Sequence, residues 1–219
     1  MRKTTIAAMA AALLALALPA LAQHQGHDDH AAHRAAAAAG GAGAERVRDL
    51  AIPDIEVVTQ DGERVRFYSD LVRGRVVAMN FTFTTCTTIC PPMGAIFGRL
   101  EKVLGERAGR EVHLITVSVD PVTDTPERLA AWAAKFGRTE GWTLVTGEKA
   151  EIVSLLKALE VFTPDFKDHP PVALLGNDAR GEWTRANALA SPAQLAEILD
   201  GLTAEPRPGA ARGVATGSE

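Results

Sequence analysis

The two cysteines of this chain, Cys86 and Cys90, are the residues whose type and spacing point most clearly to chemistry. They lie four positions apart in the segment FTFTTCTTICPPMGA, residues 81 to 95, and they are the only cysteines among 219 residues. Two cysteines cannot make a disulfide-dense scaffold, so the fold must rest on a hydrophobic core. The pair is therefore more consistent with a chemical role than with a structural one.

Three roles fit the pair. A structural disulfide would close a very short loop and would gain less than the ~3 kcal/mol expected for a loop of about 15 residues. A redox couple is a stronger interpretation, although the familiar dithiol motif has two intervening residues and this pair has three. Two thiolates from one turn would also form a soft chelate that selects Cu(I) or zinc, but such a site needs a third ligand.

His169 is the candidate third ligand. It lies in the segment FKDHPPVALLG, immediately before the apolar run at residues 172–176, and Pro170 favours an extended backbone at this histidine. In the α/β fold that the order of strands and helices indicates, the loop that enters this strand faces the cysteine turn, so an imidazole there would complete an S,S,N site. The neighbouring Asp168 is placed to orient the ring or its loop. His113, at the start of a strand-like run, is expected to be an ordinary strand-end residue.

The chain around these residues alternates between strand-like and helix-like patterns. Runs typical of strands occupy residues 75–83, 112–120, 142–146, 172–176 and 182–186. Apolar residues recur at helical spacing over residues 93–104, 129–136, 152–159 and 195–202. Thr125 and Pro126 suit the start of the second helix. A hairpin is expected at residues 55–67, around Gln60-Asp61-Gly62.

The order hairpin, β-α-β-α-β-α-β-β-α predicts an α/β fold: a thioredoxin-like three-layer sandwich with a mixed central sheet and an N-terminal β-hairpin. Cys86 would follow the strand at 75–83, and Cys90 would precede a helix begun by Pro91 or Pro92. Ligands bind at the carboxyl ends of strands in such sheets, and the positive end of a helix favours thiolate over thiol. Both sulfurs are therefore expected to be chemically available.

The two ends of the chain have the composition of segments outside the folded domain. Residues 1–22 combine two basic residues, an apolar run and the small-residue pattern ALA, which is typical of a cleavable secretory signal peptide. Residues 23–46, polar and then Ala/Gly-rich, are interpreted as a flexible tether, and residues 204–219 as a disordered tail. The folded domain is placed at residues 47–203.

Charge argues against one class of partner. The full chain has 23 Lys and Arg against 27 Asp and Glu, and removal of residues 1–22 would lower the first number to 21. Such a mildly acidic chain offers no basic face to a phosphate backbone, so nucleic-acid binding is not expected. Export would place the cysteines in an oxidising compartment, where a function of the reduced pair needs an electron donor. Any membrane association of the mature chain is expected to occur without a transmembrane helix.

The start of the tether has a second feature that could bind metal. A histidine recurs there at every third residue: His24, His27, His30 and His33. Imidazoles without thiolates suit Cu(II), zinc or nickel, and such tracts often bind metal loosely. The tract is interpreted either as an auxiliary metal site or as a solvated tail.

Three segments together resemble one known family. FTFTTCTTICPPM, ITVSVDPVTDTPERLAAWAAKF and DHPPVALLGNDARGEW are similar, in this order, to the SCO/SenC copper proteins, and the resemblance covers most of residues 50–202. It implies a thioredoxin-like domain on the outer face of a membrane, with copper, as Cu(I) or Cu(II), bound by Cys86, Cys90 and His169. It also implies a role in metallating the binuclear copper centre of cytochrome c oxidase, by delivering copper, by reducing the cysteines of that centre, or by both.

The resulting prediction is an exported metallochaperone, periplasmic or otherwise extracytoplasmic, at the outer face of the inner membrane. Its expected partners are the copper-centre subunit of cytochrome c oxidase and a thiol reductant or other copper donor. The alternative is an extracytoplasmic thiol-disulfide oxidoreductase in which Cys86 and Cys90 exchange electrons with partner proteins. Asp120 and Asp124 are expected to be structural, at a strand end and a helix-start turn, and Met93 is expected to pack in the core.

Overall fold

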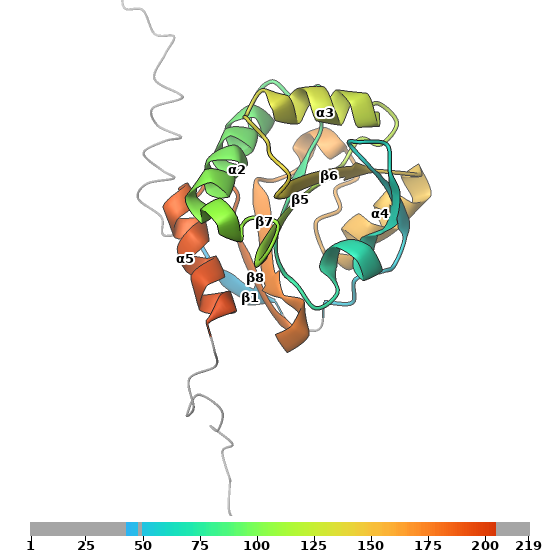
Figure 1. The fold of residues 1–219 in the computed structure, drawn as a ribbon. Helices are drawn as coiled ribbons and strands as arrows, with labels where there is room; N and C mark the ends of the chain where they lie inside the picture. The colour runs from blue at the N-terminus through green and yellow to red at the C-terminus, as the bar shows by residue number, and fades with distance from the viewer. Residues whose placement is uncertain (1–42, 48–49, 205–219) are drawn as a thin grey trace, which may run out of the picture.

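A mixed sheet of eight strands forms the centre of the described chain (Figure 1). The structure is a computed structural model that describes residues 43–47 and 50–204. The strands are β1 (Glu45–Val47), β2 (Glu56–Thr59), β3 (Arg64–Arg66), β4 (Val76–Thr82), β5 (Val112–Ser118), β6 (Trp142–Thr146), β7 (Val172–Asn177) and β8 (Glu182–Asn187). Across the sheet they stand in the order β1-β8-β7-β4-β5-β6-β2-β3.

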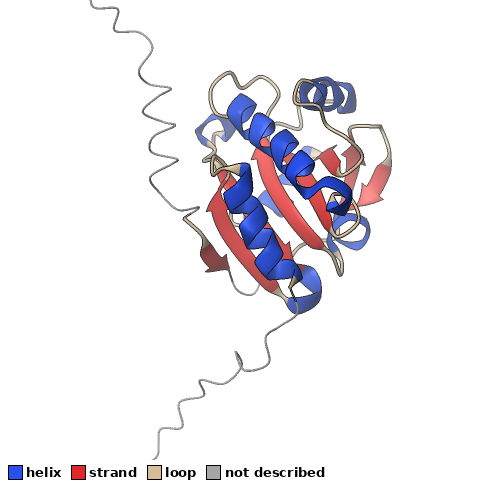
Figure 2. Cartoon of the chain, turned by 60° about the vertical axis from the view of Figure 1, so that its left-hand side comes forward, coloured by secondary structure: helices blue, strands red, loops and turns tan. Residues whose placement is uncertain are grey.

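Helices cover both faces of this sheet. The α-helices are α2 (Cys90–Leu104), α3 (Pro126–Ala134), α4 (Lys149–Ala158) and α5 (Pro192–Thr203). The shorter helical turns are η1 (Phe67–Val72), η2 (Gly105–Arg107), η3 (Phe166–Asp168) and η4 (Asp178–Arg180). Helices α2 and α5 lie side by side on one face, and α4 lies on the other (Figures 1 and 2). This arrangement is the thioredoxin-like three-layer sandwich that the order of elements predicted.

Strand β4 is the element that carries the cysteine turn. It pairs in parallel with β5 and antiparallel with β7, so both of its edges are hydrogen-bonded within the sheet. Every residue of β4 after Val76 is buried, and Met93 of α2 is fully buried in the same core, as predicted. Because β4 is fixed on its edges and faces, the turn that follows it starts from a rigid support.

Most element boundaries agree with the sequence analysis. Strands β2 and β3 form the predicted antiparallel hairpin. Pro126 begins α3, and the hydroxyl of Thr125 accepts a hydrogen bond from the backbone N–H of Arg128, as expected for a helix cap. Helix α2 begins at Cys90, one residue before the first of the two prolines. The last helix, α5, begins at Pro192.

The boundary between tether and domain was placed too late. Glu45 and Arg46, which the sequence analysis assigned to the tether, belong to β1, and β1 pairs antiparallel with β8 at one edge of the sheet. A three-residue edge strand gains its stability from backbone pairing and needs no apolar alternation, so its polar sequence gave no strand signal. The π-helical turn η1, a single wide turn, was also not predicted.

Several predictions concern residues outside the described part of the chain. These are the signal peptide at 1–22, the tether up to residue 42, the tail from residue 205, and the histidines His24, His27, His30 and His33. Within residues 43–47 and 50–204, no helix has both the length and the apolar character needed to cross a membrane.

Candidate metal and thiol site

The two cysteines lie on the turn between β4 and α2. Cys86 is partly exposed, whereas Cys90 is fully buried, and both are free thiols. The backbone N–H of Cys90 donates a hydrogen bond to Sγ of Cys86 over 3.4 Å. The first backbone N–H groups of a helix have no carbonyl partner within the helix. Pro91 and Pro92 have no N–H, so Cys90 carries one of the few such donors at the start of α2. The start of α2 therefore directs a donor at the more exposed sulfur.

The two thiols differ strongly in acidity. Burial alone would raise the pKa of Cys86, but hydrogen bonds with Cys90 and Thr88 outweigh it and hold the pKa below its ordinary value of 9.0. Burial, together with the hydrogen bond to Cys86, raises the pKa of Cys90 to about 12. Because the thiolate is the nucleophile and the soft ligand, Cys86 is the residue primed to react first.

Asp124 fixes the turn that precedes Cys86. Its carboxylate accepts hydrogen bonds from the Thr84 backbone N–H at 3.0 Å and from the Thr84 hydroxyl at 2.6 Å. The Ser118 hydroxyl at the end of β5 donates to the same carboxylate over 2.7 Å. Asp124 is 1% exposed, and this burial raises its pKa against the opposing effect of the hydrogen bonds. The predicted structural role of Asp124 thus takes a specific form, since this carboxylate joins the end of β5 to the cysteine turn.

His169 is buried beside the end of β4. Its side chain is 3% exposed, and its ring packs against Phe81 with the ring centroids 5.9 Å apart. Burial lowers the pKa of His169 to about 4, so the imidazole is neutral near pH 7. Neither ring nitrogen has a hydrogen-bond partner among the described residues. Buried polar atoms are nearly always paired, so these two nitrogens are candidates for binding a ligand.

A second aromatic contact holds the loop of His169 near the cysteine turn. Phe166 of η3 packs edge-on against Phe83, the residue after β4, with ring centroids 5.0 Å apart. The backbone N–H of Cys86 donates to the carbonyl of Phe83 over 3.2 Å. Phe83 is therefore shared between the turn that carries the sulfurs and the loop that carries the imidazole. The sequence analysis did not single out Phe81 or Phe83, although their alternation with threonines places both on one face of the strand.

The donors predicted for the site are brought to one end of the sheet but are not gathered into a closed site. In the described residues, no group of three or more His, Cys, Asp or Glu side chains is close enough to hold a metal ion. Asp168 is exposed, and within the same residues no hydrogen bond joins its side chain to His169. His113 is half-buried on β5, in line with its expected role as a strand residue.

The chemistry of the donor set nevertheless suits a soft metal ion. Two sulfurs from one turn form a chelate for copper(I) or zinc, and a neutral imidazole is a common third donor for either. The unpaired nitrogens of His169 lie on the loop that contacts Phe83, and Phe83 adjoins the sulfur turn. The types of donor present therefore fit a soft ion.

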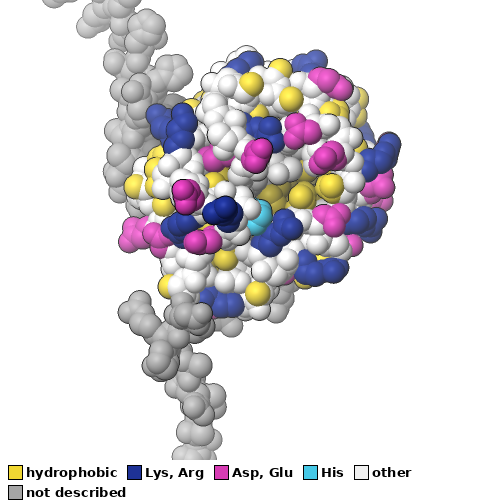
Figure 3. All heavy atoms as spheres, viewed as in Figure 1, with side chains coloured by type: hydrophobic (Ala, Val, Ile, Leu, Met, Phe, Trp, Pro, Cys, Tyr) yellow, Lys and Arg dark blue, Asp and Glu magenta, His cyan; other side chains and the backbone are white. Residues whose placement is uncertain are grey.

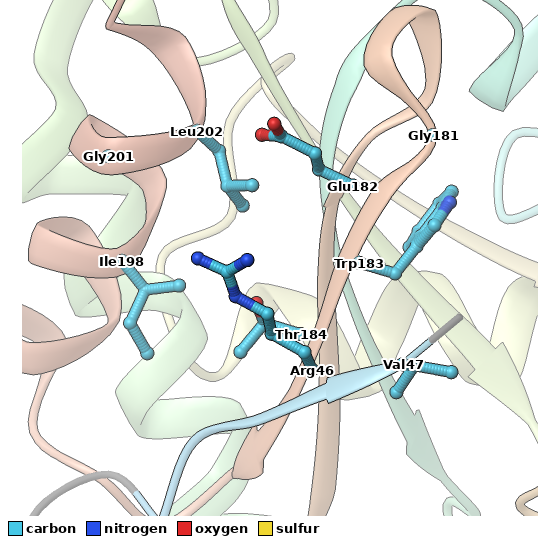
Figure 4. A pocket seen from close by; sticks show the side chains of 9 residues that line it. All are labelled: Arg46, Val47, Gly181, Glu182, Trp183, Thr184, Ile198, Gly201 and Leu202. Carbon is cyan, nitrogen blue, oxygen red and sulfur yellow. The ribbon is translucent and has the colours of Figure 1, made fainter. Parts of the chain in front are cut away.

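One cavity lies far from the cysteine turn. A hollow of about 520 Å³ opens between β1, β8 and α5, with Arg46, Glu182 and Leu202 among its lining residues (Figure 4). Glu182 pairs with Asn177, which in turn pairs with Val76 at the start of β4, so this cavity is at the opposite end of the sheet from Cys86. Its lining contains no cysteine or histidine. We assign it no part in the chemistry of the thiols.

Comparison with known proteins identifies the family. Residues 44–197 match the SCO1/SenC family model. The chain belongs to the SCO1/SenC family. An SCO1 protein homolog from Bacillus subtilis strain 168 is 36% identical over 107 residues, which are 47% of this chain and 54% of the relative. A protein from Stutzerimonas stutzeri described by name as copper-binding is 30% identical over 112 residues, which are 51% of this chain and 53% of the relative. The match thus spans about half the length of these two relatives.

Solved structures of SCO1/SenC proteins share the fold. A SCO1/SenC family lipoprotein from Bacillus anthracis is 26% identical, with a TM-score of 0.62, over 73% of this chain and 98% of that one. BsSco, described as a member of the Sco family of cytochrome c oxidase assembly proteins with a disulfide switch, is 27% identical. Its TM-score is 0.59, over 72% of this chain and 97% of that one. The thioredoxin-like fold is therefore that of the SCO1/SenC family.

Proposed function

We propose that this chain is an exported copper carrier that takes part in assembling the binuclear copper centre of cytochrome c oxidase. The observation that carries the proposal is the turn between β4 and α2, which presents the sulfur of Cys86 at the surface with Cys90 directly behind it. Copper is the cargo, held by Cys86 and Cys90, with His169 as the third ligand. The copper-binding description of the Stutzerimonas relative and the assembly role given for BsSco support this assignment.

The imidazole completes the site by a movement of its loop. The His169 ring is packed on Phe81, and among residues 43–47 and 50–204 it belongs to no group of three or more His, Cys, Asp or Glu side chains that could hold a metal. Neither ring nitrogen has a partner in the described part of the chain, and this makes the position unfavourable, because each buried polar atom without a partner costs about 1–3 kcal/mol. Coordination to copper would satisfy one nitrogen and release the ring from this penalty. Asp168, exposed on the same loop, is proposed to guide the ring in the copper-bound state.

The test is an anaerobic titration of the reduced protein with Cu(I) and with Cu(II), read by X-ray absorption. We expect one copper ion per chain, with two sulfur ligands and one nitrogen ligand. Cys86→Ala and Cys90→Ala should each abolish stoichiometric binding. His169→Ala should retain sulfur coordination but lose the nitrogen signal and bind more weakly. Full affinity and an unchanged nitrogen signal in His169→Ala would remove His169 from the ligand set.

A second function is favoured by the unequal acidity of the thiols. A pKa below 9.0 at the exposed Cys86 and a pKa of about 12 at the buried Cys90 are the properties of an attacking and a resolving cysteine. The chain would then reduce the cysteines of a partner protein. Reduction of a protein disulfide at an unchanged rate in His169→Ala, combined with loss of the rate in Cys86→Ala, would support this function independently of copper.

The site of action follows from the proposed export. Residues 1–22 have the pattern of a secretory signal, which would deliver the domain to the periplasm or an equivalent compartment. Free thiols there require a reductant, so a thiol-reducing partner belongs to the proposal together with the oxidase subunit that receives copper. The tract His24, His27, His30 and His33 is proposed as a loose metal-collecting segment. Deletion of residues 23–34 should then lower Cu(II) uptake beyond the first equivalent.

A further inference from the structure

Successive side chains of strand β4 point to opposite sides of the sheet. The Phe81 ring points to the side on which His169 lies. Asn80 points to the other side, where it accepts a hydrogen bond from a threonine hydroxyl of β5 that itself accepts from the Trp142 indole. The Trp142 ring packs on Phe97 of α2, with ring centroids 6.0 Å apart. Thr82 follows Asn80 by two residues, so its hydroxyl also points to the side that α2 covers.

Thr82 and Cys90 are the two buried ends of the cysteine turn. Thr82 is the last residue of β4, Cys90 is the first residue of α2, and both are 0% exposed. Within residues 43–47 and 50–204, Oγ1 of Thr82 is a buried polar atom that has no hydrogen-bond partner of ordinary geometry. Buried hydroxyls are nearly always paired, so an unpaired one beside a candidate ligand sulfur calls for a functional explanation.

The first turn of α2 directs no backbone N–H at the sulfur of Cys90. The N–H of Cys90 itself donates to the Cys86 sulfur, and the two prolines that follow have no N–H. The N–H of Met93 donates to the carbonyl of Ile89 over 3.1 Å. Donors for the Cys90 sulfur must therefore come from outside α2.

Two neutral groups at the end of β4 reach this sulfur. Burial and the hydrogen bond to Cys86 raise the pKa of Cys90, and hydrogen bonds from the Thr82 hydroxyl and the Phe83 backbone N–H oppose that rise. No Lys or Arg is buried in the described part of the chain, and on the face shown in Figure 3 these side chains lie at the surface. A negative charge on the Cys90 sulfur therefore depends on neutral donors, because a buried charge without hydrogen bonds is costly.

We propose that Thr82 is a positioning residue of the metal site, whose hydroxyl donates a hydrogen bond to the Cys90 sulfur when that sulfur binds a soft metal ion. The inference rests on the proposed function, because it names a group that stabilises one of the proposed ligands. A metal-bound sulfur has the negative charge of a thiolate, and hydrogen bonds to charged groups are about twice as strong as neutral ones. The hydroxyl thus contributes to metal affinity and little to the stability of the metal-free fold.

Thr82→Val tests this role, because valine keeps the shape of threonine and lacks only the hydroxyl. The reduced protein is titrated anaerobically with Cu(I) and, separately, with Zn(II), which thiolates also bind, each in competition with a coloured chelator. The variant should bind each ion about tenfold more weakly, which corresponds to about 1.4 kcal/mol. Without metal, its unfolding midpoint in urea should equal or exceed that of the unmodified protein, because the substitution removes an unpaired buried hydroxyl.

Two further variants serve as controls. Thr82→Ser keeps a hydroxyl at this position and should restore the metal affinity. Thr85→Val makes the same change at an exposed residue of the same turn and should leave the affinity unchanged. Unchanged affinity in Thr82→Val, or an equal loss in Thr82→Ser or Thr85→Val, would overturn the proposal. A lower unfolding midpoint of metal-free Thr82→Val would overturn it as well, since the hydroxyl would then already stabilise the metal-free fold.

The two ions separate this inference from the copper function. If the unmodified protein binds Zn(II) but not Cu(I), the copper function fails, and the Zn(II) affinities of the variants still decide the role of Thr82. If Cu(I) binds equally well to the unmodified protein and to Thr82→Val, the copper function remains and the role of Thr82 fails. Binding of neither ion would refute both.

Discussion

Asp124 and Thr84 are joined by two hydrogen bonds, from the Thr84 backbone N–H at 3.0 Å and from its hydroxyl at 2.6 Å, to one buried carboxylate. Thr84 is two residues before Cys86, so this contact sets where the turn leaves the sheet. Asp124 also accepts from Ser118, and it therefore couples the ends of β4 and β5 at the site. The position of the reactive sulfur depends on a carboxylate that does not itself react.

Removing this carboxylate should therefore disturb both stability and reactivity. Asp124→Ala leaves the donors of Thr84 and Ser118 without a partner, and the expected loss is about 2–4 kcal/mol in the free energy of unfolding. Urea denaturation measures the loss, and the alkylation rate of Cys86 reports on the turn. Asp124→Asn, which keeps the volume and one acceptor, should lie between Asp124→Ala and the unmodified protein. Equal unfolding midpoints for all three proteins would contradict the role given to Asp124.

The two thiols should react at very different rates. Between pH 7 and pH 8 iodoacetamide should label Cys86 at least about tenfold faster than Cys90, because Cys86 is the more exposed and the more acidic of the two. Mass spectrometry of peptides from the reduced protein measures the two rates. The rate at Cys86 should follow a titration with a midpoint below pH 9.0. Faster labelling of Cys90 would exclude the order of attack proposed here.

Burial of His169 should make the copper-free protein sensitive to acid. Its pKa is lowered from 6.5 to about 4, so the folded state favours the neutral ring. The resulting stability is fully present above pH 6.5 and is lost as the pH falls from 6.5 to 4, and it amounts to about 3 kcal/mol at most. Urea denaturation at pH 7 and at pH 4 measures this loss.

His169→Phe is the matched variant, because a phenyl ring keeps the contact with Phe81 and cannot bind a proton. Its stability should fall less between pH 7 and pH 4 than that of the unmodified protein, by about 2–3 kcal/mol. The carboxylates titrate in both proteins, so the difference between the two isolates the histidine. An identical acid loss in the two proteins would show that the folded state does not keep His169 buried and neutral.

Two glycines of α2 allow close contact with α3, and one of them gives a sharp test of packing. A Cβ on Gly98 would clash with the carbonyl oxygen of Phe136, and a backbone atom cannot move aside as a flexible side chain can. Gly98→Ala should therefore destabilise the protein by about 1–3 kcal/mol. Gly201 of α5 has no heavy atom within 4 Å of its ideal Cβ, so Gly201→Ala should stabilise by about 0.5–1 kcal/mol.

Thermal unfolding distinguishes the two substitutions. The same change, glycine to alanine within a helix, should lower the melting temperature at Gly98 and raise it at Gly201. Stabilisation at both positions would mean that α2 does not pack against Phe136, just after α3, as closely as the structure shows.

The sequence by itself determined the elements and the family. Apolar runs and helical spacing placed β4, β5, β6, β7 and the four α-helices, because period and apolar content decide such elements locally. The Cys-x3-Cys-Pro turn, joined to the Asp-Thr-Pro-Glu segment and the later Asp-His, is enough to indicate the SCO/SenC family. The short edge strand β1 was not predicted. It is stabilised by pairing with β8, which is far away in the chain, and its own sequence has no apolar pattern.

Only the tertiary structure decided how the site is arranged. No local pattern could show that Asp124 binds Thr84, that Phe166 packs on Phe83, or that His169 is buried. Those contacts depend on which strand ends lie next to one another in the sheet. The position of the His169 ring also depends on whether its contact with Phe81 outweighs its exposure to water. The sequence could name candidate donors, but only the packing shows where the imidazole lies, because the contact of the His169 ring with Phe81 joins segments far apart in the chain.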